Sequence, residues 1–354
     1  MPHGQDYIRG LPEYDNHHLV TYLHDERTAL EAFVAIHRKN GALPSFGATR
    51  LWQYRSEEEA LRDALRLSRL MSYKAALASL PCGGAKGVII HSGEPTEDHR
   101  SALIEAYADK ISSLKDSFVT GTDVGIRQSD LRVMRERTPN IIGFNDNTAE
   151  FTALGVYHAI CCALRHVHGD DDLKERTFAI QGVGKVGGEL LKLLYGETRG
   201  IFVADIDDER LRMMRSAYPN IEIVPTETIH RQVVDVFSPC ALSSAVKTSN
   251  VSELACRIVA GGANNQLEKE DVGDILHKMD ILYAPDYVVN AGGLIAVYDE
   301  YEHSDYDAER VREKVVKIEG RLDALIKASR EQNRPISRIA NEMAERIFNN
   351  YGKQ

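Results

Sequence analysis

Three glycines separate a predicted strand from a predicted helix in the segment TFAIQGVGKVGGELLKLLY. Gly182, Gly184 and Gly187 follow the β-rich run 178–181, and the next β-rich run ends on Asp205, eighteen residues after the third glycine. Glycines at this spacing let a pyrophosphate approach the positive end of a helix, and the acid can accept hydrogen bonds from a ribose hydroxyl. The segment therefore predicts a Rossmann-type domain that binds a dinucleotide.

The chain after about residue 172 alternates between β-rich and helical segments. GIFVADID, VDVFSPCAL, CRIVAGGANNQL and DILYAPDYVVNAGG each begin with a β-rich run and end in small or polar residues. Short strands of this kind predict a doubly wound α/β sheet whose carboxyl ends bind the ligand. A helical tail is expected from Ala308, because one apolar stripe follows it at helical spacing: Val311, Val315, Ile318, Leu322 and Leu325.

The residues after Asp205 favour NAD over NADP. Asp207 and Asp208 add to its negative charge, so a 2′-phosphate would be repelled. Arg210 is the only nearby cation that could upset this preference, and it lies about one helical turn farther along. The residues expected to bind NAD are Gly182, Gly184, Lys185, Val186, Gly187, Asp205 and Ile206.

Length and charge limit the possible partners and the number of domains. At 354 residues the chain exceeds what one hydrophobic core usually serves, so two domains are expected. A net charge of −10 disfavours nucleic acid or an anionic membrane as a partner. The start MPHGQDYIRG lacks the apolar core of a signal peptide, and no long apolar stretch follows, so we expect a cytoplasmic protein. The five cysteines form no metal-ligand spacing with the histidines, so no metal is expected.

The N-terminal part contains two lysines and an aspartate that can share one site. SEEEALRDALRLSRLMSYKAALA opens with a capping-box pattern, Ser56 and Glu59, and predicts a long helix that carries Lys74. The following SLPCGGAKGVII places Lys86 in an expected glycine turn that precedes a short buried strand. DSFVTGTDVGI predicts another strand, followed by a loop that carries Asp123.

Lys86 does not belong to a P-loop, because Gly87 stands where that motif needs Ser or Thr. The helix break between Lys74 and Lys86 allows both to face one cleft. A charged Lys74 could hold a substrate carboxylate and, together with burial, lower the pKa of Lys86 enough for it to act as a base. Asp123 could then move a proton to or from an amine.

Other interpretations of Lys86 remain open from the residues alone. It could be a solvated lysine in a glycine turn, or it could form a Schiff base with a carbonyl substrate or pyridoxal phosphate. The Schiff-base interpretation leaves the dinucleotide motif without a use. A non-catalytic NAD-binding regulator is a further alternative, although such a protein would be expected to lack one of Lys74, Lys86 and Asp123.

Over about residues 45–300 the sequence resembles the glutamate, leucine, phenylalanine and valine dehydrogenase superfamily, on its short leucine/phenylalanine side. Tryptophan dehydrogenases are similar too. The resemblance rests on motifs in family order: ALRLSRLMSYKAALASLPCGGAKGVII, TGTDVG, GVGKVG, FSPCAL, AGGANNQL and APDYVVNAGGL. It implies oxidative deamination of an L-amino acid to its 2-oxo acid and ammonia, with hydride passing to NAD, and the reverse reductive amination.

The resemblance also implies roles for individual residues. Lys74, helped by Asn264, would bind the α-carboxylate. Lys86 would activate the water that attacks the imino intermediate, and Asp123 would handle the protons of the amine. Further cofactor contacts are implied for Thr152 at the carboxamide end of the nicotinamide, and for Cys240, Ala241, Asn264 and Asn290.

A set of mostly apolar positions matches the family's pocket for the substrate side chain. In glutamate-using relatives a lysine occupies the position of Phe46, and a phenyl ring cannot pair with a distal carboxylate. We therefore expect an apolar substrate, branched-chain or aromatic, and rejection of glutamate. Phe46 could also simply pack in a core. The full set is Phe46, Ala75, Leu80, Gly121, Leu294, Ile295, Val297 and Tyr298.

The expected fold is α/β with two domains. Residues 1–148 would form an α/β domain for substrate binding and oligomerisation, with the helix at 328–354 packing back on it. Residues 149–327 would form the Rossmann-type NAD domain. A homo-oligomer, either a dimer or an octamer, is expected. The segment GFNDNTAEFT departs from relatives that are rich in glycine and proline there, so its contacts with the nicotinamide are an open question.

Overall fold

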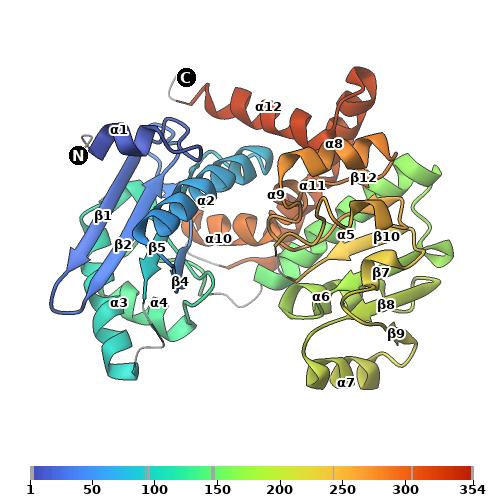
Figure 1. The fold of residues 1–354 in the computed structure, drawn as a ribbon, viewed down its shortest axis with the longest axis horizontal. Helices are drawn as coiled ribbons and strands as arrows, with labels where there is room; N and C mark the ends of the chain where they lie inside the picture. Colours follow the sequence, from blue (N-terminus) through green and yellow to red (C-terminus); the bar gives the residue numbers. More distant parts are fainter. Residues whose placement is uncertain are drawn as a thin grey trace. The chain divides into compact units, whose positions relative to one another are not determined.

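The computed structural model describes residues 4–91, 93, 96–144, 148–241, 243–303 and 306–351. The chain forms two compact α/β units, each with its own sheet (Figure 1). The first unit comprises Met1–Asn145 and Ala344–Gln354, and the second comprises Asp146–Met343. Within the described ranges, no helix has both the length and the apolar character needed to cross a bilayer.

A mixed sheet lies at the centre of the first unit. Its order is β1-β2-β5-β3-β6, and β4 pairs with the second half of β5. β2 is antiparallel to β5, whereas β3 and β4 are parallel to it. The strands are β1 (Leu19–Asp25), β2 (Leu30–Ile36), β3 (Ser45–Phe46), β4 (Thr49–Trp52), β5 (Gly83–Ile90) and β6 (Phe118–Val119). The helices are α1 (Gly4–Arg9), α2 (Glu57–Leu77), α3 (Glu97–Ser112), η1 (Lys115–Ser117) and α4 (Gln128–Arg137).

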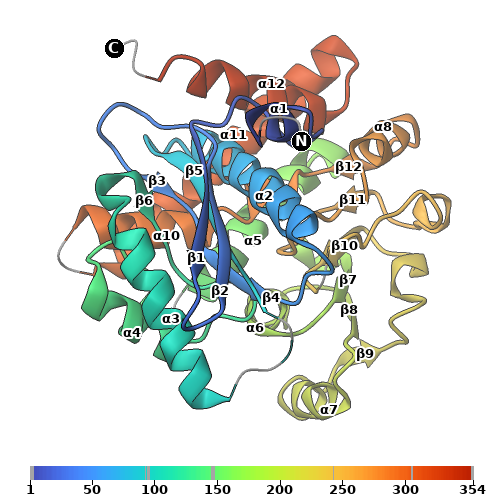
Figure 2. The same ribbon diagram turned by 60° about the vertical axis from the view of Figure 1, so that its left-hand side comes forward.

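Helices cover both faces of this sheet. Successive side chains of a strand point to opposite faces, so each strand contributes to two cores. Val88 of β5 packs with Ala64 and Leu65 of α2, whereas Ile89 packs in the core that α3 and α4 share. Figure 2 shows α2 and α3 on either side of β1 and β2. Alternate residues of β5 therefore face α2 on one side of the sheet and the core of α3 and α4 on the other.

The long helix α2 begins as the sequence predicts. Ser56 is its N-cap, and its side chain accepts a hydrogen bond from the backbone N–H of Glu59. The Glu59 carboxylate in turn accepts from the backbone N–H of Arg55. The helix ends at Leu77, before Pro81, because Ser79 adopts a left-handed conformation with φ of 59°.

The expected glycine turn around Lys86 is wrong, since Gly83, Gly84 and Gly87 all lie within strand β5. None of the three has a positive φ. They are needed for close packing instead: an added Cβ would overlap the Arg38 carbonyl at Gly83, the backbone of α2 at Gly84, and the Tyr107 hydroxyl at Gly87. The glycines therefore bring β5 against its neighbours while leaving it extended.

The second unit contains the doubly wound parallel sheet that the sequence predicts. The order β12-β11-β10-β7-β8-β9 is that of a Rossmann fold, and the order reverses between β7 and β10. All of its strand pairs are parallel. The strands are β7 (Thr177–Gln181), β8 (Gly200–Ala204), β9 (Ile221–Ile223), β10 (Val236–Pro239), β11 (Ile258–Val259) and β12 (Leu282–Tyr283).

Helices of the second unit pack around this sheet and around α5. The predicted apolar stripe of the tail is buried in α11, which packs against α5. The helices are α5 (Thr148–His168), η2 (Leu173–Glu175), α6 (Lys185–Leu194), α7 (Asp208–Ala217), η3 (Ile229–Arg231), η4 (Val251–Glu253), α8 (Glu270–Lys278), α9 (Asp286–Val289), α10 (Gly292–Glu302) and α11 (Ala308–Gln332). The last helix, α12 (Ile336–Phe348), begins in the second unit and ends in the first.

Candidate active site

Lys86 and Asp123 form an ion pair in the first unit. Nζ of Lys86 donates to Oδ2 of Asp123 at 2.5 Å, and the Lys86 side chain is only 6% exposed. Lys86 shares with Gly84 and Val88 the face of β5 that α2 covers, because side chains alternate along a strand. Asp123 lies in the loop after β6. The sheet thus brings together the two residues that the sequence predicts to carry out proton transfer.

Burial and charge shift the pKa of both residues. Burial is the main reason that the pKa of Lys86 is lowered; Arg50 adds to this effect and Asp123 opposes it. Burial alone would raise the pKa of Asp123, but Lys86 and Arg50 outweigh it and hold that pKa well below its usual range. Asp123 is therefore an anion at neutral pH, and Lys86 releases its proton more readily than a lysine in water.

Arg50 of β4 also contacts Asp123, a contact that the sequence analysis missed. Its Nε donates to the same Oδ2 atom at 2.9 Å, and its guanidinium donates to Oδ2 of Asp63 in α2, also at 2.9 Å. Asp63 accepts a further hydrogen bond from the Tyr54 hydroxyl at 2.7 Å. Arg50 lies 73 positions from Asp123 in the chain, so no local pattern could have indicated the pair.

Lys74 occupies the last turn of α2 and is half-buried. The hydroxyl of Ser72 accepts a hydrogen bond from the backbone N–H of Gly84 at 2.9 Å. This bond joins α2 to β5 two residues before Lys74 and two residues before Lys86. The two predicted lysines therefore follow the same point of helix–strand contact.

The glycine-rich turn of the second unit has the geometry of a pyrophosphate site. Gly182 has a φ of 90°, and a Cβ added to Gly187 would overlap the Gly182 carbonyl. By contrast, a Cβ on Gly184 would meet no described atom within 4 Å. Gly184 is the N-cap of α6 and provides no side-chain cap, so the first N–H groups of this helix are available to an anion. The three glycines fit the turn, the phosphate approach and the helix packing of a dinucleotide site.

Asp205 lies at the end of β8 and contacts this turn. Its Oδ2 accepts from the backbone N–H of Val183 at 2.9 Å, and its Oδ1 accepts from Arg210 at 3.0 Å. Arg210 also pairs with Asp207. The cation that the sequence places about one turn away thus contacts the carboxylate directly. It offsets part of the negative charge on which the expected preference for NAD depends.

A cavity of about 330 Å³ lies beside the turn. Its volume is within the range of small-molecule sites. Asp205 and Ile206 line it from the segment after β8, and Gly182 and Ala241 line it from the loops after β7 and β10. Cys240 packs nearby: its Sγ accepts from the backbone N–H of Gly262 at 3.4 Å, and burial raises its pKa to about 11. This is the edge where the strand order reverses, as expected for a ligand site of this fold.

Two predicted asparagines meet in the second unit. Nδ2 of Asn290 donates to Oδ1 of Asn264 at 2.9 Å and to the carbonyl of Gly262 at 3.2 Å. Oδ1 of Asn290 is buried and has no hydrogen-bond partner among the described residues. A buried acceptor without a donor is unfavourable, so it fits a ligand N–H or O–H group. Nicotinamide and ribose carry such donors.

The hydroxyl of Thr152 bridges two helices of the second unit. It donates to the carbonyl of Thr148 in α5 at 2.7 Å and accepts from the backbone N–H of Gly293 in α10 at 3.1 Å. The predicted contact with the nicotinamide would use its remaining acceptor position. Asn145, Asp146 and Asn147 of the divergent segment lie outside the described residues.

The predicted pocket positions belong to both units. Phe46 is 1% exposed and lies in β3, where it pairs with Gly84 of β5. Tyr298 lies in α10 and is also buried. The others in the first unit are Ala75, Leu80 and Gly121, and the others in the second unit are Leu294, Ile295 and Val297.

Two side-chain clusters in the described ranges have donor atoms close enough for a metal ion. One consists of Cys162, His166 and Asp323, and the other of Asp299, Glu302 and His303. Cationic side chains already neutralise the carboxylates: Lys327 pairs with Asp323 at 2.8 Å, and Lys314 pairs with Asp299 at 2.8 Å. Neither cluster is part of the sites described above.

Comparisons with known proteins place both units in one family. Residues 17–140 match the profile of the Glu/Leu/Phe/Val dehydrogenase dimerisation domain, and residues 197–349 match the Glutamate/Leucine/Phenylalanine/Valine dehydrogenase profile. Leucine dehydrogenase of Bacillus subtilis is 36% identical over 96% of this chain and 93% of its own. Phenylalanine dehydrogenase of Thermoactinomyces intermedius is 39% identical over 89% of this chain and 86% of its own. The crystal structure of L-tryptophan dehydrogenase from Nostoc punctiforme superposes with a TM-score of 0.82 at 36% identity, covering 96% of this chain and 97% of that one. The chain therefore belongs to the Glu/Leu/Phe/Val dehydrogenase family.

Proposed function

We propose that this amino acid dehydrogenase catalyses the NAD-dependent oxidative deamination of an apolar L-amino acid, together with the reverse reductive amination of the 2-oxo acid. The observation that carries this proposal is the buried Lys86–Asp123 pair in a chain that also has a dinucleotide-binding turn. The first unit would supply the acid–base groups, and the second would hold the cofactor.

Lys86 is the proposed general base. In the deamination direction, the neutral side-chain amine of Lys86 takes a proton from the water that attacks the imino carbon. Ammonia later leaves that carbon as the carbonyl group forms. Asp123, an anion beside Lys86, takes up and returns the protons of the substrate amine. Lys74, at the end of α2, is the proposed partner of the α-carboxylate, with Asn264 as a second contact.

The nicotinamide cofactor supplies the acceptor for the hydride that leaves the α-carbon. The glycine turn and the N-terminus of α6 would hold its pyrophosphate. Asn290 and Thr152 would bind the nicotinamide end, and the cavity lined by Asp205 and Ile206 would hold the adenosine. These contacts fix the cofactor while the groups of the first unit act on the substrate.

NAD is the proposed cofactor rather than NADP. Asp205 directly follows β8, the second strand of the Rossmann order, after which such folds carry the acid that binds the ribose hydroxyls, and Asp207 and Asp208 follow it. Because Arg210 already pairs with Asp205 and Asp207, we expect it to weaken the preference without reversing it.

An apolar side chain is the proposed substrate feature. Relatives named for leucine, phenylalanine and tryptophan all match at least 89% of the chain. By the resemblance, Phe46 matches the position at which glutamate-using members of the superfamily carry a lysine. A distal carboxylate buried there without a partner would cost roughly several kcal/mol. The branched-chain and aromatic alternatives are both compatible with the buried side chains at the pocket positions.

Two other functions are less well supported. A Schiff-base enzyme would have no use for the glycine turn and the cavity beside it, and a non-catalytic regulator would have no need for the buried Lys86–Asp123 pair. Self-association through the first unit is also proposed, because that unit matches the dimerisation domain of the family.

The test is a steady-state assay of the purified protein with NAD or NADP against a panel of L-amino acids. We expect kcat/KM to be higher for leucine, phenylalanine or tryptophan than for glutamate, and higher with NAD than with NADP. Asp205→Ser should narrow the NAD/NADP ratio of kcat/KM, and Asp208→Ser, which removes the same charge from a residue that does not line the cavity, should narrow it less. Higher kcat/KM for glutamate would refute the substrate class, and a wild-type preference for NADP would refute the cofactor.

A further inference from the structure

Two cations contact one oxygen of Asp123. Lys86 donates to Oδ2 at 2.5 Å, and Arg50 donates to the same atom at 2.9 Å. The side chains of Asp123 and Arg50 are 19% and 23% exposed, so water screens this contact only partly. Burial makes Lys86 lose its proton more readily than a lysine in water, whereas the guanidinium of Arg50 remains protonated.

Arg50 is also anchored by α2, through a nitrogen that does not contact Asp123. The register of β4 with β5 pairs Arg50 with Val88, so its side chain faces α2, as that of Lys86 does. There its second donor binds Asp63 at 2.9 Å, and Asp63 is itself fixed by Tyr54 at 2.7 Å. A planar guanidinium can serve both carboxylates at once, which the single ammonium of a lysine cannot do in the same geometry.

We propose that Arg50 is a positioning residue for the reaction: anchored by Asp63, it fixes the carboxylate of Asp123 and keeps a permanent positive charge beside Lys86. This inference rests on the proposed roles of Lys86 and Asp123. Arg50 acts through Asp123 and contacts no reacting atom in the proposed reaction.

The charge of Arg50 acts on Lys86 in the direction that a general base needs. The charged groups that influence Lys86 are Asp123 from the loop after β6, Arg50 from β4 and Asp63 from α2. A nearby cation disfavours the ammonium form, whereas Asp123 favours it. Without Arg50, the carboxylate of Asp123 would pair with Lys86 alone, so the ammonium would become more stable and the neutral amine scarcer.

The test compares the pH dependence of kcat in the full-length enzyme and in Arg50→Met, Arg50→Lys and Arg66→Met. Arg66 is the matched control, because it pairs with Oδ1 of Asp63 at 2.7 Å and, within the described part of the chain, forms no hydrogen bond or ion pair with Asp123. Arg50→Met should lower kcat near pH 8 by about 10- to 100-fold and raise the midpoint of the pH profile by about one pH unit. Arg50→Lys should bring the midpoint back towards the wild-type value, because it retains the charge. Arg66→Met should leave the profile unchanged.

A purely structural Arg50 would lower thermal stability without moving the pH midpoint, and that result would overturn the inference. If Arg50→Met does not fold, Asp63→Asn decides, because it keeps Arg50 and weakens the contact that anchors it. This variant also removes an anion that favours the ammonium form of Lys86, so the anchor is judged by kcat and not by the pH midpoint. A fall in kcat of about 3- to 10-fold with an unchanged KM for NAD supports positioning, and an unchanged kcat contradicts it. If Lys86→Ala is inactive while Arg50→Met keeps the kcat and the pH profile of the wild type, only this inference is rejected. If the wild-type enzyme itself is inactive, the proposed function is rejected.

Discussion

The reactivity of Lys86 is set by neighbours that lie far from it in sequence. A lysine in water has a pKa near 10.4, so it is almost wholly protonated at neutral pH. In this protein burial is the largest effect that lowers the pKa of Lys86, and the nearby anion Asp123 prevents the shift from being larger. The pair thus combines a lysine that can lose its proton with a carboxylate that is already charged.

Replacement of Lys86 should separate catalysis from cofactor binding. Lys86→Ala removes the proposed base, so kcat should fall by about 10²-fold or more. In the wild type, kcat should rise with pH as the ammonium loses its proton and should level off below the ordinary pKa of lysine, whereas Lys86→Ala should lose this dependence. Steady-state kinetics across pH and calorimetric titration with NAD measure the two effects.

Lys110→Ala is the control for that experiment, because Lys110 lies exposed in the last turn of α3. It should match the wild type in both measurements. Near-normal turnover in Lys86→Ala would contradict the assignment of the base, and loss of NAD binding would indicate a wider structural defect.

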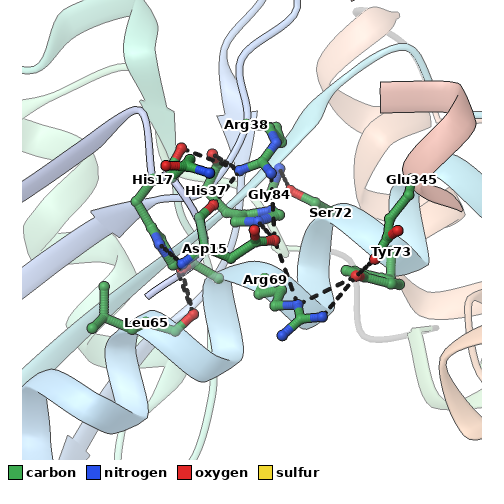
Figure 3. A network of polar contacts seen from close by, with 12 residues as sticks. Asp15, His17, His37, Arg38, Leu65, Arg69, Ser72, Tyr73, Gly84 and Glu345 are labelled. Carbon is green, nitrogen blue, oxygen red and sulfur yellow. Dashed lines mark hydrogen bonds and ion pairs between the residues drawn. The ribbon is translucent and has the colours of Figure 1, made fainter. Parts of the chain in front are cut away.

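At the scale of elements, a partly buried polar network joins the residue after β2, helix α2 and the end of α12 within the first unit (Figure 3). Nε2 of His37 contacts Asp15 at 2.9 Å, and Arg69 links Asp15 to the Tyr73 hydroxyl. That hydroxyl donates to Glu345 of α12 at 2.7 Å. Tyr73 immediately precedes Lys74, so the network fixes the part of α2 that carries the proposed carboxylate-binding residue.

This network should make the protein less stable in mild acid. Burial is the main reason that the pKa values of His17 and His37 are both lowered, each to about 4. Between that value and the ordinary value of 6.5 the unfolded chain binds more protons than the folded one. Their contribution is therefore fully present above about pH 6.5 and is lost as the pH falls towards 4, by roughly 3 kcal/mol for one ring.

Urea unfolding between pH 7 and pH 4.5 measures this loss. His37→Gln can still donate to Asp15 but cannot take up a proton, so its free energy of unfolding should fall less steeply with acid than that of the wild type. His24→Gln, at an exposed position of β1, is the control and should follow the wild type. Equal slopes for His37→Gln and the wild type would show that His37 does not contribute.

Elements set by local interactions could be predicted from the sequence, and those set by distant contacts could not. The N-cap of α2, the glycine turn after β7 and the apolar stripe of α11 each depend on residues within a few turns of one another. The need for glycines in β5 arises instead from close contacts with Arg38, α2 and Tyr107, which are distant in sequence. The glycine-rich sequence alone therefore wrongly indicated a turn. Arg50 was missed for the same reason, since its partners are reached only through the pairing of β4 with β5.

The whole molecule should divide its tasks between the two units. Each unit has its own hydrophobic core, so each can respond separately to ligands and substitutions. The proposed function places cofactor binding in the second unit and proton transfer in the first. Substitutions in one unit should therefore affect one property and leave the other intact.

Gly184 and Gly187 allow this division to be tested, because their surroundings differ. Gly184→Ala should fold normally, since the added Cβ meets no described atom within 4 Å, but its methyl group would occupy space that the proposed site gives to the pyrophosphate. Gly187→Ala should unfold more easily, because its Cβ would overlap the Gly182 carbonyl.

Hydrogen exchange of peptides from β7 and β8, with and without NAD, measures both effects. At a concentration of 100 times the wild-type Kd, NAD should raise the opening free energy of these peptides by up to about 2.7 kcal/mol in the wild type and in Lys86→Ala. The increase should be much smaller in Gly184→Ala. Equal stabilisation of all three proteins would contradict the proposed cofactor site, because a dinucleotide bound elsewhere would not be affected by the added methyl group.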